Sequence, residues 1–120
     1  MKLSERQQWL RNARQYLKDA NDGASNLRKN KTKRSTITSN FIDKAPTVHI
    51  EENISLYVKT SQAFLIIGKW RDAAFALGQA AGMYHFELDL VGEAAELYTE
   101  AGLLAEKIFV LDGIEYFSEL

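Results

Sequence analysis

The 120-residue sequence contains no cysteine, one proline and only two histidines. Without cysteine it has no disulfide framework and no thiolate metal site. His49 and His85 stand far apart with no second ligand at metal spacing, so we expect neither a metal nor another cofactor. There is no Gly-rich phosphate loop and no arrangement of serine, histidine and aspartate typical of a hydrolase, so we do not expect an enzyme.

The sequence also lacks long apolar segments. No run approaches the roughly 20 apolar residues of a membrane span. The first residues, "MKLSERQQWLRNARQY", carry no apolar signal-peptide core. We therefore expect a cytoplasmic protein.

The formal net charge is only −1, but the charges are unevenly distributed. Residues 1–46 hold eleven Lys and Arg against four Asp and Glu, whereas residues 87–120 hold one Lys against nine acids. Two interpretations are open: ordinary solvated helix faces, or a basic and an acidic surface that bind unlike partners. No aromatic residue interleaves with the densest basic run, "RKNKTKR", and base stacking needs one, so we do not expect nucleic-acid binding.

Apolar residues recur at three- and four-residue steps, the spacing of amphipathic helices. The pattern predicts a helix over residues 1–20, ended by "NDG" at 21–23, and a basic flexible loop over residues 21–48. Helix pairs follow over residues 49–120, with helices expected at about 49–67, 70–87 and 90–107 and a short one from Asp112. That short helix is either a docked end, or the chain is the N-terminal part of a longer protein.

A weak repeat links these helices. "LY" at 56–57 recurs at 97–98, and "DAA" at 72–74 recurs at half that step as "EAA" at 93–95. A repeated unit of two antiparallel helices is typical of an α-solenoid, in which stacked pairs bury each other's faces. We therefore predict an all-α fold, a single domain over residues 1–120 built as a TPR-like α-solenoid of antiparallel helix pairs, with four to five helices. The alanine-rich stretch in "WRDAAFALGQAA" predicts a helix packed closely between two neighbours.

The segment 54–107, "ISLYVKTSQAFLIIGKWRDAAFALGQAAGMYHFELDLVGEAAELYTEAGLLAEK", resembles the N-terminal repeats of the soluble NSF attachment proteins, the SNAPs. The resemblance implies an adaptor that binds assembled SNARE complexes for disassembly by the AAA+ ATPase NSF in vesicle fusion. The part of a SNAP that contacts the ATPase has no counterpart in this sequence. By the resemblance, the SNARE-binding candidates are Lys59, Lys69 and Arg71.

In SNAPs the loop between the first two helices touches the membrane, so the resemblance also implies a peripheral membrane protein. This chain lacks the adjacent aromatic residues of that loop and is basic instead. The membrane candidates are Leu27, Arg28, Lys29, Lys31, Lys33, Arg34 and Phe41. They favour weak attraction to an anionic membrane surface, by charge more than by insertion. The alternative is a solvated loop with no membrane role.

Two other functions stay open at the level of sequence. One is a generic TPR-like scaffold that binds some other helix or peptide. The other is a truncated SNAP-like decoy that binds SNAREs without recruiting the ATPase.

Overall fold

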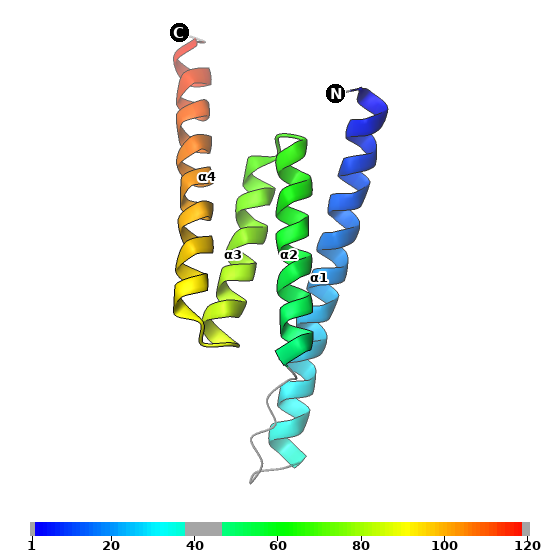
Figure 1. Cartoon of the computed structure of the whole chain (residues 1–120). Helices are drawn as coiled ribbons and strands as arrows, with labels where there is room; N and C mark the ends of the chain where they lie inside the picture. The colour runs from blue at the N-terminus through cyan, green and yellow to red at the C-terminus, as the bar shows by residue number, and fades with distance from the viewer. Residues whose placement is uncertain (1, 38–46, 119–120) are drawn as a thin grey trace.

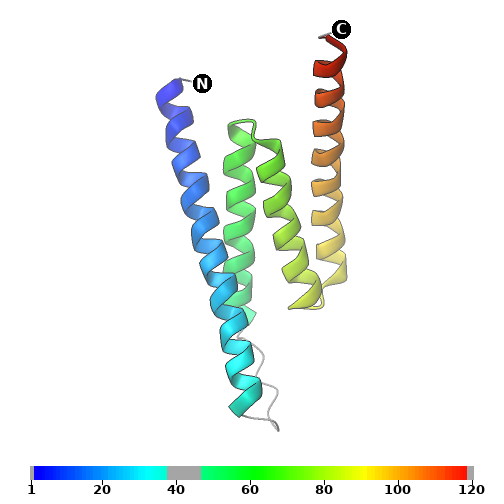
Figure 2. The same cartoon turned by 180° about the vertical axis from the view of Figure 1, so that it is seen from behind.

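The computed structural model describes residues 2–37 and 47–118, and the side chains of residues 2–29 and 47–108. The described residues form four helices: α1 (Leu3–Ile37), α2 (Thr47–Ile66), α3 (Trp70–Phe86) and α4 (Val91–Ser118). Consecutive helices run antiparallel and stand side by side in chain order (Figures 1 and 2). Because α1 and α4 lie at opposite edges, these helices form an open array and not a closed four-helix bundle. The all-α prediction is confirmed, whereas the solenoid arrangement stays a prediction.

The predicted end of the first helix is wrong. Residues 21–37, expected within a flexible loop over residues 21–48, continue α1 to Ile37. Gly23 lies inside the helix and does not end it. Its lack of a side chain matters for the packing of α1 against α2. A Cβ at Gly23 would overlap Oδ1 of Asn53, so this glycine lets α2 approach α1 closely. The last turns of α1 project beyond the start of α2 (Figure 1).

The predicted break in the last helix is also wrong. We expected one helix to about residue 107 and another from Asp112, but α4 runs unbroken from Val91 to Ser118. An acidic residue caps a helix only where the chain enters it from a non-helical conformation. No proline interrupts this stretch, and a single glycine at Gly113 weakens a helix without ending it.

The boundaries of α2 and α3 agree closely with the predicted ones. Gly68 occupies the left-handed region (φ 74°) in the turn between them, where glycine is favoured. Asp89 also has a positive φ (55°) in the turn before α4, which aspartate tolerates better than most residues.

Small side chains let the helices pack closely. Ala73, Ala76, Ala80 and Ala81 are all fully buried on α3, which contacts both α2 and α4, as the alanine-rich pattern predicted. Trp70, at the start of α3, is only half-buried.

Two core clusters each draw residues from all four helices. In the first, Ala13, Phe64 and Ala73 pack together with Leu104 at its margin. In the second, Ala20, Tyr57 and Ala80 pack together with Leu97 at its margin. The clusters stack along the array: the first includes Ala13 of α1 and Leu104 of α4, and the second includes Ala20 and Leu97.

Candidate interaction surfaces

The three SNARE-binding candidates lie on and near the α2–α3 turn. Lys69 is half-buried in the turn, where its backbone N–H donates to the carbonyl of Phe64 at 2.9 Å. Its own carbonyl accepts from the N–H of Ala73 at 3.1 Å. Arg71 follows, exposed, in the first turn of α3. Lys59 is exposed on α2, about two helical turns or roughly 10 Å before the end of that helix. The fold thus brings Lys69 and Arg71 to one end of the array, with Lys59 further along it.

The membrane candidates do not lie on a loop as expected. Leu27 is half-buried on α1 and packs against the second core cluster, so it is not available for insertion into a bilayer. Arg28 and Lys29 are exposed on α1. The side chains of Lys31, Lys33 and Arg34, and the whole of Phe41, lie outside the described residues.

Polar side chains join the first three helices inside the array. The Tyr57 hydroxyl donates to Oδ1 of Asn21 at 2.8 Å, between α2 and α1. Burial raises the pKa of Tyr57, and the positive charge of Arg28 partly opposes that shift. Nδ2 of Asn53 donates to Sδ of Met83 at 3.2 Å, between α2 and α3.

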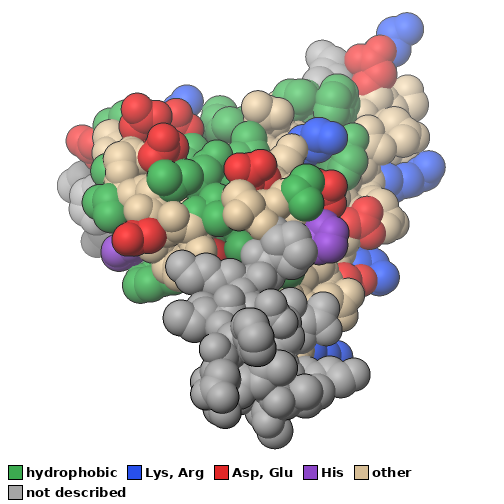
Figure 3. Space-filling model, turned by 60° about the horizontal axis from the view of Figure 1, so that its bottom comes forward, with side chains coloured by type: hydrophobic (Ala, Val, Ile, Leu, Met, Phe, Trp, Pro, Cys, Tyr) green, Lys and Arg blue, Asp and Glu red, His purple; other side chains and the backbone are tan. Residues whose placement is uncertain are grey.

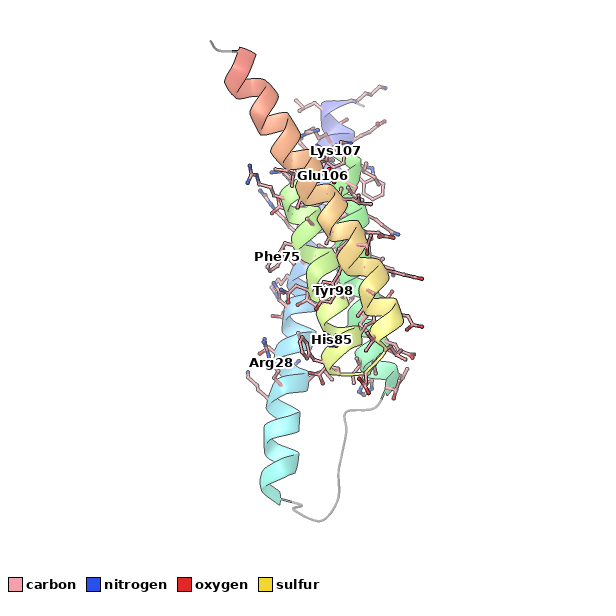
Figure 4. All side chains as sticks on the ribbon, turned by 90° about the vertical axis from the view of Figure 1, so that its left-hand side faces the viewer. Arg28, Phe75, His85, Tyr98, Glu106 and Lys107 are labelled. Carbon is pink, nitrogen blue, oxygen red and sulfur yellow. The ribbon has the colours of Figure 1, made fainter. Side chains whose placement is uncertain are left out.

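An exposed aromatic surface on α3 and α4 was missed by the sequence analysis. The rings of His85 and Phe86 stack with centroids 4.3 Å apart, and Tyr98 meets His85 edge-on at 6.4 Å. Phe75 and Phe86 are 56% and 74% exposed. Figure 4 shows Phe75, His85 and Tyr98 on the flank that α3 and α4 form. The sequence did contain a signal for this surface. Because α3 is buried through its alanines, the larger side chains on its opposite face, such as Phe75, are exposed.

The uneven charge of the sequence becomes two different edges in the fold. Arg11, Arg14 and Lys18 are exposed on α1, at one edge of the array. Glu96, Glu100 and Glu106 are exposed on α4, at the other edge. Lys and Arg side chains accordingly gather mostly on the α1 side of the molecule in Figure 3.

No family model, curated protein or solved structure matches this chain. The likeness to SNAPs therefore stands on the quoted residues alone. Across residues 2–37 and 47–118, no helix is both long enough and apolar enough to cross a membrane. In the same part of the chain, no three His, Asp or Glu side chains gather where they would hold a metal ion.

Proposed function

We propose that this chain is a SNAP-like adaptor that binds the assembled helical bundle of a SNARE complex. The observation that carries the proposal is an open array of antiparallel helices with basic residues at one turn. Lys69 is held in that turn by two backbone hydrogen bonds, Arg71 is exposed beside it, and Lys59 is exposed along α2. In this proposal a long acidic ligand lies along the array and contacts these three charges.

The proposal assigns different roles to the remaining charges. The acidic edge on α4 is unsuited to an acidic bundle and faces away from it. The basic end of α1 lies close to an anionic membrane surface, which holds the protein peripherally on the cytoplasmic side. Since Leu27 is packed within the fold, this attraction is electrostatic. NSF would be recruited through a C-terminal region that this sequence does not contain.

The test compares binding of an assembled SNARE bundle with binding of the separate SNARE helices, at low and moderate salt. The key variant is Lys59→Glu/Lys69→Glu/Arg71→Glu. The matched control is Lys2→Glu/Arg6→Glu/Lys29→Glu, which makes the same change in net charge at exposed residues on or next to α1. Each exposed ion pair contributes about 0.2–1 kcal/mol, and reversal also adds repulsion. We therefore expect a loss of affinity of roughly tenfold or more in the key variant, and little loss in the control.

Two outcomes would contradict the assignment. One is binding of the separate helices as tight as binding of the bundle. The other is an equal loss of affinity in the key and control variants, which would indicate attraction by overall charge alone.

The aromatic surface on α3 and α4 favours a second candidate, a scaffold for a single amphipathic helix. Exposed aromatic residues are common anchors for helical peptides. In that case Phe75→Ala/Phe86→Ala would abolish binding of a peptide helix, whereas reversing the three basic residues would leave it unchanged.

A further inference from the structure

The outer face of α4 exposes an apolar side chain surrounded by acids. Leu103 is 60% exposed, and Glu96, Glu100 and Glu106 are exposed around it at helical spacing. Within the described part of the chain, none of these three carboxylates forms an ion pair. Lys107 is the single basic residue in the sequence of α4, and its Nζ lies over the ring of Trp70, 4.1 Å from the centroid. Its charge is therefore directed toward α3.

The outer face of α1 has the opposite character. Arg11, Arg14 and Lys18 are exposed at spacings of three and four residues, so they lie on one side of the helix. Lys18 also pairs with Asp22 at 3.1 Å. Both groups are largely solvated, so the pair is weak and Lys18 can pair with another carboxylate instead. Because α1 and α4 form opposite edges, the two faces of one molecule cannot meet each other.

We propose that the acidic edge of α4 binds the basic edge of α1 from a second copy of this chain. The two edges are complementary in charge, and they are also level. The first core cluster contains Ala13 of α1 and Leu104 of α4, and the second contains Ala20 and Leu97, so α1 and α4 share the same layers of the core in antiparallel order. A second copy set beside the first without displacement along the helix axes therefore puts the stretch Arg11 to Lys18 opposite the stretch Glu96 to Glu106, and we assign Arg11 to Glu106 and Lys18 to Glu100.

In the proposed contact the Arg14 side chain lies across Leu103, since both are exposed in the middle of their charged stretches. The aliphatic stem of an arginine covers apolar surface well while its guanidinium stays solvated. The new pair of helices is antiparallel, as every neighbouring pair in the array is. The second copy thus continues the array by adding the next helix.

Such a contact is heterologous, because each copy uses two different edges, and it need not close into a ring. Growth is then open-ended and depends on protein concentration. Since the contact relies on solvated charges, it weakens as salt shortens the range of their attraction.

The experiment is sedimentation velocity over a range of protein concentrations, at roughly 20 mM and 500 mM salt. We expect the average sedimentation coefficient to rise with concentration at low salt and to stay at the monomer value at high salt. The acidic-edge variant is Glu100→Lys/Glu106→Lys, and the basic-edge variant is Arg11→Glu/Lys18→Glu. Each is expected to lower the association constant by roughly tenfold or more, because like charges then face each other.

Mixing the two variants makes the test specific. The acidic-edge variant is basic on both α1 and α4, and the basic-edge variant is acidic on both. In a mixture, each edge of one variant therefore meets an edge of opposite charge on the other variant. We therefore expect the equimolar mixture to associate. The variant that carries all four substitutions in one chain should associate by itself, because its two edges are again of opposite charge. The control, Glu51→Lys/Glu52→Lys, reverses two exposed acids on α2 and should associate like the unaltered protein.

Three results would overturn the proposal: a monomer at every concentration in low salt, association that persists in both edge variants, or a mixture that stays monomeric. Circular dichroism of each variant confirms that the helices are retained, so that loss of association is not loss of folding.

Discussion

Replacement of Gly23 by alanine tests how closely α1 and α2 pack. In the interior of an ordinary helix, glycine to alanine raises stability, because alanine loses less conformational entropy on folding. At Gly23 the added Cβ would overlap Oδ1 of Asn53 and lie 3.2 Å from its Cγ. Asn53 is only 3% exposed, and its Nδ2 donates to Sδ of Met83. The amide therefore has no free space to turn into, and either this hydrogen bond breaks or α2 moves away from α1.

The expected magnitude follows from two opposing effects. Overpacking of a buried site costs about 1–3 kcal/mol, and the gain in helix propensity offsets up to about 1 kcal/mol of it. Gly78 in α3 is the matched control, because nothing lies within 4 Å of a Cβ added there. Both variants gain the same propensity, so their free energies of unfolding should differ by about 1–3 kcal/mol, with Gly23→Ala the less stable.

Urea unfolding followed by far-ultraviolet circular dichroism measures both values. Gly78→Ala should be more stable than the unaltered protein and Gly23→Ala less stable. In an Asn53→Ala background, the Gly23→Ala change should become favourable, because the overlapping oxygen is gone. If Gly23→Ala and Gly78→Ala stabilise the protein equally in the original background, α2 does not pack on Gly23 and the register of α1 against α2 is wrong.

Two further predictions concern polar groups of α2. Tyr57→Phe removes the hydrogen bond to Asn21 and should lower the free energy of unfolding by about 0.5–1.5 kcal/mol at neutral pH. Burial raises the pKa of Tyr57 above its ordinary value of 10.0, so the neutral hydroxyl contributes stability that is complete below that pH and is lost as the pH rises further. Thermal melts in alkaline buffers should show this loss in the unaltered protein, and a smaller one in Tyr57→Phe. The Ser61 hydroxyl is buried with no hydrogen-bond partner among the described residues, so Ser61→Ala should raise the melting temperature. A clear fall in that variant would mean that the hydroxyl is hydrogen-bonded after all.

Local signals were sufficient to predict α2 and α3. Gly68 stands between two strongly periodic segments. Its positive φ is a property of the turn alone and does not depend on contacts with distant residues. The alanines of α3 predicted its close packing for a similarly direct reason, since small side chains leave room for neighbouring helices.

The end of α1 was not predictable from local signals. "NDG" is a common helix stop, and Gly23 alone gives no sign that another helix will approach it. That information resides in Asn53, thirty residues away, which occupies the space that a side chain would need. Once a helix is nucleated, extending it is far easier than starting it, so a polar segment without apolar periodicity can still continue it.

The candidate surfaces were predictable only in part. Composition indicated that the two ends of the chain differ in charge, but the order of helices across the array decides that α1 and α4 become opposite edges. The burial of Leu27 could not be foreseen either, because it depends on the continuation of α1 alongside α2.

The positions of these surfaces make the two proposed interactions compatible. The α2–α3 turn, which carries Lys69 and Arg71, lies in the middle of the array, whereas both charged edges lie at its sides. A copy that binds a helical bundle through the turn therefore still has α1 and α4 available for neighbouring copies. Copies joined edge to edge would present several basic turns together, and binding of one would raise the effective concentration of the next. Three modest charges on each copy would then suffice for firm attachment to a long acidic ligand, which a single copy would bind only weakly.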